Sequence, residues 1–113
     1  MEEASLIQFF NDDFDQMVAG NLDAMMANYH PDAQVIRLPN DLAQGKDEIR
    51  AFFKGYIEMH PEIIEVLSIK AHDNCLIYHS TVKIGDAVRD LVGTWVLRDG
   101  LIWRQTAAFV PAE

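Results

Sequence analysis

The stretch GNLDAMMANYHPDA, residues 20–33, ends one element, builds a second and leads into a third. Gly20 suits the left-handed position that follows the last turn of a helix. Asn21 can cap a new helix by accepting a backbone N–H group. Pro31 lacks an N–H group and restrains His30 from helical geometry. The stretch therefore predicts a turn between two helices, the end of the second helix at His30-Pro31, and a strand beyond it.

Helical spacing of apolar residues extends this prediction in both directions. Residues 3–19 form an amphipathic pattern whose apolar positions are Leu6, Phe10, Phe14 and Met17. The short second helix carries its own apolar face of Leu22, Met25, Met26 and Tyr29. The strand that follows is predicted at Ala33–Leu38. A loop, PNDLAQG, separates it from a third helix at Lys46–Met59, which His60-Pro61 ends.

Beyond residue 62 the apolar period changes from helical to two, which is typical of strands. The predicted strands are Ile63–Ala71, Leu76–Ile84, Ala87–Leu97 and Leu101–Val110. Short turn signals between them predict consecutive antiparallel hairpins. Helices that come first and a meander that follows predict an α+β fold with helices on one face of a curved sheet. The length of 113 residues predicts one domain, residues 1–113.

Composition and charge exclude several classes of function. The chain carries 18 acidic and 9 basic residues, for a net charge of −9. Binding of nucleic acid or of an anionic membrane surface needs clustered Lys and Arg, so neither partner is expected. No apolar run reaches the roughly 18 residues of a membrane span, and the N-terminus is acidic where a secretory signal would be basic. We expect a cytoplasmic protein in which Cys75 is a buried, inert thiol.

The four histidines, His30, His60, His72 and His79, show no spacing that would predict a metal site. The sequence also lacks a glycine-rich phosphate loop and a dinucleotide fingerprint. We therefore expect neither a metal ion nor a cofactor.

Several motifs, taken in order, resemble one known family. They are the long first helix, GNLDAMMANYHPDA, GKDEIRAFF at residues 45–53 and WVLRDGLIWRQTAAF at residues 95–109. Together they resemble the SnoaL-like branch of the nuclear transport factor 2-like superfamily, which also contains the ketosteroid isomerase-like proteins. The resemblance covers nearly the whole chain. It implies a cone-shaped α+β barrel, in which three N-terminal helices pack on a strongly curved, mostly antiparallel sheet and leave a hydrophobic pocket at the open end.

This resemblance predicts a pocket better than it predicts a reaction, because members include isomerases, polyketide cyclases, limonene epoxide hydrolases and noncatalytic binding or dimerisation domains. Aligned on the family, Asp13 falls where ketosteroid isomerases carry an oxyanion-hole tyrosine. Arg37 falls at their base aspartate, and Gly93 at their protonated acid. Gln105 falls where epoxide hydrolases carry an aspartate. All four positions depart from those patterns, so neither reaction transfers intact.

Asp13 and Arg37 are the candidate catalytic residues. Asp13 lies within the apolar arc of the first helix, where an unpaired carboxyl would have a raised pKa. Arg37 shares one strand face with Ala33 and Val35, and the family alignment turns that face inward. There the guanidinium would need an anion, either Asp13 or a group of the ligand. The alternatives are an Asp13 at the rim, solvated or paired with Arg37, and an exposed Arg37.

Alternation along the strands, together with the family register, predicts the inner lining. The expected ligand-contacting residues are Tyr29, Tyr56, Tyr78, Trp95, Trp103, Gln105 and Phe109. Large apolar rings with a polar handle suit a flat hydrophobic ligand. The alternative is that several of these residues only pack the core, and the same choice is open for Met17, Met25 and Met26.

The opposite face of the sheet is mixed and moderately apolar, so we expect a homodimer through it, as in relatives. For function, the leading hypothesis is a protein that binds a small hydrophobic molecule, polyketide-, steroid- or terpenoid-like. If it is an enzyme, we expect a cofactor-independent isomerase, cyclase or hydratase that works by acid–base chemistry. The alternative is a noncatalytic ligand-binding or dimerisation module of the same fold.

Overall fold

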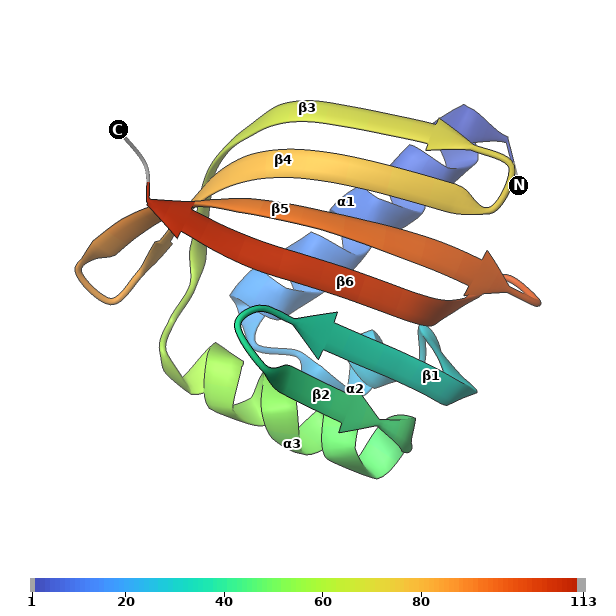
Figure 1. Cartoon of the computed structure of the whole chain (residues 1–113), viewed down its shortest axis with the longest axis horizontal. Coiled ribbons are helices and arrows are strands. Elements are labelled where there is room, and N and C mark those ends of the chain that lie inside the picture. Colours follow the sequence, from blue (N-terminus) through green and yellow to red (C-terminus); the bar gives the residue numbers. More distant parts are fainter. Residues whose placement is uncertain (1, 112–113) are drawn as a thin grey trace.

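The computed structural model describes residues 2–111, which form three helices and six strands (Figure 1). The helices are α1 (Glu3–Ala19), α2 (Leu22–Met26) and α3 (Gly45–Glu58). The strands are β1 (Tyr29–Arg37), β2 (Asp41–Gln44), β3 (Glu62–His72), β4 (Cys75–Ile84), β5 (Ala87–Arg98) and β6 (Leu101–Pro111). None of these helices has the length and apolar composition that crossing a membrane requires.

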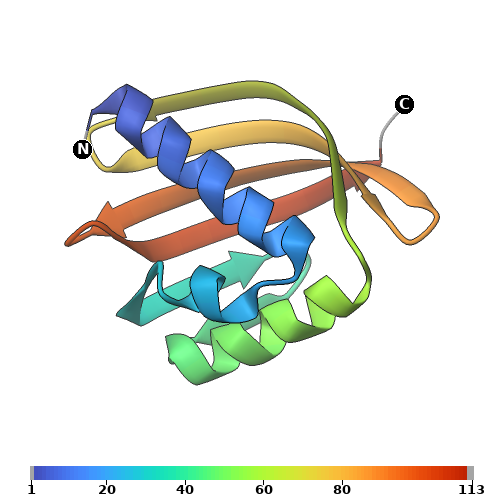
Figure 2. The same cartoon turned by 180° about the vertical axis from the view of Figure 1, so that it is seen from behind.

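The strands of residues 2–111 form one sheet in the order β2-β1-β6-β5-β4-β3. All neighbours are antiparallel except β1 and β6, which run parallel. The sheet is curled but not closed, and the helices lie on its inner face, with α1 across β3–β6 and α3 beside β1 and β2 (Figure 2). The predicted α+β class with three helices on a curved, mostly antiparallel sheet is confirmed.

The stretch from Gly20 to Ala33 behaves as predicted in its first half. Gly20 has a φ of 78°, and its N–H group bonds to carbonyl groups of the last turn of α1. Asn21 accepts a hydrogen bond from the Ala24 N–H group at 3.3 Å and so caps α2. The second half differs, because β1 already begins at Tyr29 and contains His30-Pro31. Pairing with β6 is irregular between Tyr29 and Gln34, which accommodates a proline without an N–H group.

The segment predicted as a loop between β1 and α3 contains a strand. Strand β2 pairs antiparallel with β1, with Ile36 opposite Leu42 and Arg37 opposite Asp41. Its four residues are too few to show an alternating pattern next to turn-forming Pro39 and Asn40, so periodicity could not find it. This edge strand places Arg37 on an inner strand of the sheet.

The predicted third helix and the four later strands are present, with boundaries shifted by at most one residue. The prediction that Cys75 is buried is wrong. Cys75 is the first residue of β4 and is exposed, because the side chain that faces the core at this end of the strand is Leu76.

The inner face of β4 and β5 packs against α1 through an aromatic cluster, which we call the Trp95 cluster. Trp95 is fully buried, and its ring lies 5.9 Å from Phe9, 5.2 Å from Phe10 and 6.4 Å from Phe14 between ring centroids. These edge and tilted arrangements are the ones that aromatic quadrupoles favour. Helix α1 is therefore fixed on the sheet by apolar packing close to Asp13.

The start of β6 contains a bulge that overturns one prediction. Val96 pairs with Arg104 and Leu97 pairs with Ile102, so Trp103 is an extra residue in β6. A bulge of this kind changes which side chains face inward. Ile102 is fully buried, whereas Trp103 is half-buried beneath Arg98 and Arg104, whose guanidinium carbons lie 5.5 and 3.7 Å from its ring centroid.

Candidate functional site

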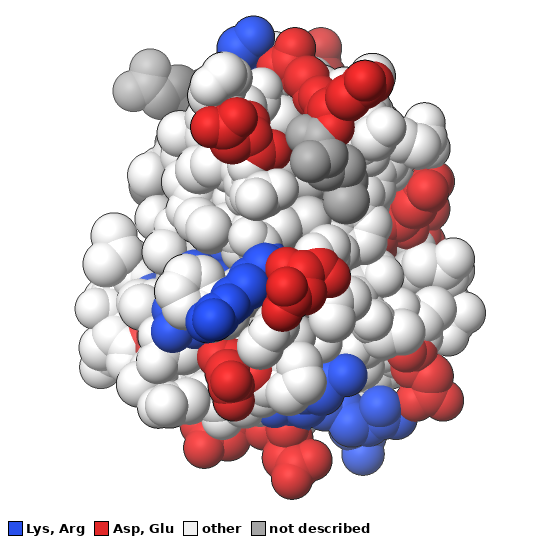
Figure 3. All heavy atoms as spheres, turned by 90° about the vertical axis from the view of Figure 1, so that its right-hand side faces the viewer, with Lys and Arg blue, Asp and Glu red and all other residues white. Residues whose placement is uncertain are grey.

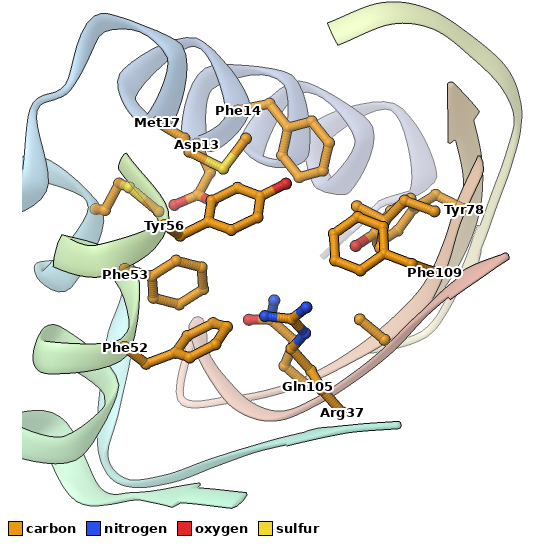
Figure 4. A pocket seen from close by; sticks show the side chains of 13 residues that line it. Asp13, Phe14, Met17, Arg37, Phe52, Phe53, Tyr56, Tyr78, Gln105 and Phe109 are labelled. Atoms are coloured by element: carbon orange, nitrogen blue, oxygen red, sulfur yellow. The ribbon is translucent and has the colours of Figure 1, made fainter. Parts of the chain in front are cut away.

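A hollow lies between the helices and the inner face of the sheet (Figure 4). Its lining comes from the three helices and from β1, β4, β5 and β6. It consists of Asp13, Phe14, Met17, Met25, Arg37, Phe52, Phe53, Tyr56, Tyr78, Leu91, Gln105, Ala107 and Phe109. Its volume is about 30 Å³, which is room for roughly two water molecules. The wall is mostly apolar and aromatic, with a few polar groups that face one another.

Asp13 is the carboxyl group of this hollow. It lies on α1 between Phe10 and Met17 and is 2% exposed. Burial raises the pKa of Asp13 to about 6, and a hydrogen bond from Asn28 opposes part of that rise. The carboxyl group therefore exchanges its proton close to neutral pH, as a general acid or base requires.

Asn28 is a partner of this carboxyl that sequence reasoning missed. Its Nδ2 donates to Asp13 Oδ1 at 3.0 Å. Asn28 lies two residues beyond the end of α2, and its backbone carbonyl accepts a hydrogen bond from the Ile102 N–H group at 2.8 Å. No sequence pattern marks it, since its role depends on how α2 and β6 meet.

Arg37 enters the hollow from β1, but it does not pair with Asp13. Its guanidinium carbon lies 4.7 Å from the ring centroid of Phe52, 4.9 Å from that of Phe109 and 6.0 Å from that of Tyr56. Aromatic faces attract a cation through their quadrupole. The expectation that Arg37 points inward agrees with the structure, whereas the alternatives of an Asp13–Arg37 ion pair and of a solvated Asp13 do not.

Two tyrosines contribute hydroxyl groups. Tyr56 on α3 is buried, and its hydroxyl group has no hydrogen-bond partner among the described residues. Burial raises the pKa of Tyr56 to about 12, and the nearby charge of Arg37 opposes part of that rise. Burial also raises the pKa of Tyr78, and Tyr56 and Asp13 add to this effect while Arg37 opposes it. Both phenols stay protonated at neutral pH and can act as donors.

Gly93 explains how Tyr78 reaches this position. Tyr78 and Gly93 are cross-strand partners on β4 and β5. A Cβ atom on Gly93 would lie 2.7 Å from the Tyr78 hydroxyl oxygen and 2.7 Å from the Thr106 carbonyl oxygen. The tyrosine ring therefore lies over the bare backbone of Gly93. The phenol of Tyr78 thus occupies the space that a side chain at position 93 would fill.

Gln105 of β6 lines the hollow, and a hydrogen bond from Tyr29 fixes its side chain. The Tyr29 hydroxyl donates to Gln105 Oε1 at 2.5 Å. This bond uses the amide oxygen, so the amide Nε2 is the group that Gln105 can offer to a ligand. Tyr29 is fully buried and does not line the hollow; it positions Gln105 instead.

The structure places the nine predicted site residues in two groups. Six of them line the hollow, namely Asp13, Arg37, Tyr56, Tyr78, Gln105 and Phe109. Three do not: Tyr29 lies behind Gln105, Trp95 fills the core next to α1, and Trp103 lies outside the core because of the bulge. The placement of Trp103 on the inner face was wrong. Among the methionines, Met17 and Met25 belong to the wall and Met26 does not.

Phe52 and Phe53 of α3 line the hollow but were not among the predicted ligand-contacting residues. A helical pattern shows that such residues are buried, but it does not show whether they meet a neighbour or an open space. Phe52 and Arg37 also line a second hollow of about 350 Å³ beside β2, together with Asp41, Leu42 and Glu48. The two side chains therefore lie between the small inner hollow and this larger outer one.

Residues 2–111 contain no group of three His, Cys, Asp or Glu side chains close enough to hold a metal ion. On the face shown in Figure 3, the basic side chains form separate small groups among acidic ones rather than a continuous stripe. This distribution gives nucleic acid no extended basic track on that face.

Comparison with known proteins gives a consistent result. The profile of the SnoaL-like domain family matches residues 8–105. A SnoaL-like protein of unknown function from Burkholderia thailandensis E264 is 18% identical, with a TM-score of 0.83, over 97% of this chain and 98% of that one. A putative ketosteroid isomerase from Kribbella flavida DSM 17836 is 18% identical, with a TM-score of 0.79, over 88% of this chain and 73% of that one.

A third similar structure is that of SalBIII, described as an epoxide hydrolase/cyclase-like enzyme in pyran ring formation of the polyether salinomycin. It is 14% identical, with a TM-score of 0.80, over 91% of this chain and 88% of that one. No curated protein sequence matches the chain. At these identities the structural neighbours establish the fold, while the chemistry has to be argued from the hollow itself.

Proposed function

Because the chain belongs to the family of SnoaL-like domains, we propose that its hollow binds a small hydrophobic molecule and moves a proton on it without a cofactor. The substrate class is a polyketide-, steroid- or terpenoid-like carbonyl compound. The reaction class is isomerisation, cyclisation or hydration. Relatives with this fold that are described as a putative ketosteroid isomerase and as an epoxide hydrolase/cyclase-like enzyme support this proposal.

The observation that carries the proposal is the environment of Asp13. A carboxyl group that is 2% exposed, and whose pKa is raised to about 6, lines a hollow with a guanidinium and two phenol groups. A buried carboxyl lowers the stability of the fold whenever it is ionised. A carboxyl group at this position is therefore a candidate for a functional role.

In the proposed step the Asp13 carboxylate removes a proton from a carbon next to the ligand carbonyl and becomes a carboxylic acid. The electron pair of the broken C–H bond forms the C=C bond of an enolate, and the negative charge moves to the carbonyl oxygen. Arg37 and the phenol donors stabilise this oxygen. Asp13 then returns the proton to another carbon, which completes an isomerisation and restores the carboxylate.

A volume of about 30 Å³ does not accommodate such a ligand without movement. Arg37, Phe52 and Phe109 are half-buried, and the first two separate the small hollow from the larger one beside β2. Rotation of these side chains joins the two spaces. We therefore place ligand entry on the β2–α3 side of the molecule.

The experiment measures deuterium exchange of α-protons in a panel of cyclic ketones and β-diketones in D₂O by NMR, together with turnover of ketosteroid, polyketide and epoxide substrates. The wild-type protein is expected to accelerate exchange of at least one ketone. Asp13→Asn removes the base and is expected to lower that rate by about 100-fold or more.

The matched control is Asp15→Asn, which changes an exposed carboxylate on the same helix. It is expected to leave the rate unchanged. A rate that survives Asp13→Asn would show that the role given to Asp13 is wrong. A protein inactive on every substrate that still binds ketones would favour the alternative, a noncatalytic ligand-binding module.

We also propose that the chain forms a homodimer through the outer face of the sheet, and that it works in the cytoplasm. Ile36, Leu38, Ile77 and Val110 expose 45%, 66%, 50% and 42% of their surface. Ile36, Leu38, Val92 and Ala108 surround one depression on this face, and exposed apolar patches of this kind favour contact with a partner. Sedimentation analysis is expected to show a dimer for the wild type and a monomer for Ile36→Glu. A wild-type monomer at all concentrations would reject the interface.

A further inference from the structure

Arg37 has an unusual environment for a cation in the inner part of a sheet. Its guanidinium lies between the rings of Phe52 and Phe109, with Tyr56 further away. Aromatic rings attract a guanidinium over their faces, but they do not accept the in-plane hydrogen bonds that its five N–H groups offer. The rings therefore orient the cation and leave its hydrogen-bonding capacity for another group.

Within residues 2–111, no carboxylate oxygen lies within 4.0 Å of the Arg37 guanidinium. Asp13 lines the same hollow but bonds to Asn28. Asp41 is the cross-strand neighbour of Arg37 and lines the outer hollow, yet it is also beyond that distance. The described part of the chain thus brings a cation into the wall of a hollow and supplies no anion for it.

Tyr56 adds a second unused donor on the same wall. Its hydroxyl group is buried and has no hydrogen-bond partner within residues 2–111, and its ring is stacked with that of Phe109 at 6.3 Å between centroids. Ser80 and Trp95 also have buried polar atoms that lack a partner in the described part of the chain, but neither of them lines the hollow. Tyr56 and Arg37 lie around the same space and both require an acceptor.

We propose that the ligand of this hollow is an apolar monocarboxylate, whose carboxylate is bound by the Arg37 guanidinium and the Tyr56 hydroxyl group. This inference rests on the proposed function, which requires that the hollow binds a ligand. It adds that the ligand carries a permanent negative charge. A planar guanidinium matches a carboxylate through two parallel hydrogen bonds. The apolar part of the ligand lies against Phe52 and Phe109, and the carbon that reacts faces Asp13. In such a ligand Arg37 is occupied by the carboxylate, so the Tyr78 phenol and the Gln105 Nε2 group stabilise the enolate oxygen of the proposed step.

The overall charge of the protein opposes the binding of a carboxylate, so tighter binding of a carboxylate than of a neutral analogue would be informative. With a net charge of −9, the long-range field of the chain repels anions. A carboxylate that binds more tightly than a neutral molecule of the same shape must therefore owe its affinity to a local cationic site.

The test compares isosteric pairs of probes by calorimetric titration: cyclohexanecarboxylate with cyclohexanecarboxamide, and 2-naphthoate with 2-naphthamide. The wild-type protein is expected to bind the acid of at least one pair about tenfold more tightly than the amide, as charge-assisted hydrogen bonds would give. Arg37→Gln is expected to bind both members equally. Arg37→Lys, which keeps the charge without the planar fork, is expected to retain a reduced preference, and Tyr56→Phe is expected to lose a few-fold of it.

Arg89→Gln is the matched control, because it removes one exposed arginine of β5 that lies outside the hollow. It should leave the preference unchanged. Equal affinity for acid and amide, an acid preference that survives Arg37→Gln, or no binding of either member of both pairs would each overturn the proposal. If Arg37→Gln does not fold, the acid preference of Arg37→Lys and of Tyr56→Phe tests the proposal. A preference that is unchanged in both variants would overturn it.

Asp13→Asn separates this inference from the proposed function. It is expected to keep or increase the acid preference, since it removes a negative charge from the same hollow. A normal acid preference with no exchange activity would refute the proton-transfer proposal and leave the carboxylate site in place. Exchange activity without an acid preference would refute the carboxylate site and leave the proton-transfer proposal in place.

Discussion

The Trp95 cluster and the hollow beside it are built from the same kinds of side chain but differ in what those side chains do. In the cluster, Trp95, Phe9 and Phe10 fill the space between α1 and the sheet, and Phe14 lies at the border with the hollow. In the hollow, Phe52 and Phe109 surround a guanidinium and leave open volume. One region uses its aromatic rings to exclude water, and the other uses them to orient a charge.

The polar groups of the two regions differ in the same way. Trp95 has a buried Nε1 with no hydrogen-bond partner among residues 2–111, but this atom is enclosed in the core. Asp13, Arg37 and Tyr56 all line the hollow, which leaves open volume beside them. A polar group without a partner is therefore informative about function only where its neighbourhood leaves room for one. The predictions below test this contrast.

The largest effect is expected from Trp95→Ala. Removing a fully buried indole from the cluster should lower the free energy of unfolding by about 3–5 kcal/mol. Phe109→Ala removes a half-buried ring from the wall of the hollow and should cost clearly less. Urea denaturation measures both. Equal costs would mean that the hollow is packed as tightly as the core.

Asp13→Asn is expected to change how stability depends on pH. Burial raises the pKa of Asp13 from 3.8 to about 6. Between these values the folded chain holds the proton more tightly than the unfolded chain, so the wild type loses stability as pH rises from about 4 to about 6.5. The loss is on the order of 3 kcal/mol, and Asp13→Asn should lack it.

The measurement is a series of urea midpoints between pH 4 and pH 7.5 for the two proteins. The variant should be the more stable one at pH 7.5, with the difference shrinking toward pH 4. A wild type and a variant whose curves run parallel would contradict the buried, titrating carboxyl.

Gly93→Ala is expected to cost about 1–3 kcal/mol, because the new Cβ atom would meet the Thr106 carbonyl oxygen and the ring of Tyr78. Gly55→Ala on α3 is the control. A Cβ atom there meets nothing within 4 Å, and alanine in a helix should stabilise by about 0.5–1 kcal/mol. Thermal unfolding compares the two, and a harmless Gly93→Ala would remove the reason given for the position of Tyr78.

The smallest effect is expected from Tyr56→Phe. Its hydroxyl group makes no hydrogen bond to any of the residues that the structure describes, so stability should stay unchanged or rise by up to about 1 kcal/mol. Tyr29→Phe, which removes the hydrogen bond to Gln105, should instead lower stability by about 1 kcal/mol. If Tyr56→Phe costs as much as Tyr29→Phe in urea denaturation, the Tyr56 hydroxyl is not free for a ligand.

Most of the fold could be predicted from sequence because its elements are long and strongly periodic. Residues 3–19 show a clear helical period, and Gly20 and Asn21 mark the turn by local backbone chemistry. Strand β2 escaped prediction because four residues at an edge carry no periodic signal. The bulge at Trp103 escaped because one inserted residue shifts the alternation without changing the composition.

The site was less predictable, since it depends on packing between distant elements. Asp13 could be found because a charge within an apolar arc breaks a local pattern. Arg37 could be placed by alternation, but its aromatic surroundings come from α3 and β6. Asn28 carries no signal in the sequence, because its bond to Asp13 joins two elements that only the tertiary fold brings together.

The most direct test of the proposal that Asp13 is a buried carboxyl prepared for proton transfer is a ¹³C NMR titration of its carboxyl carbon in the wild-type protein. A midpoint near pH 6 is the expected result, with a shift to higher pH in Asn28→Ala, where the hydrogen bond that favours ionisation is absent. A midpoint near 3.8, the ordinary value of an aspartate, would show that water reaches this carboxyl freely and that the hollow holds no group prepared for proton transfer.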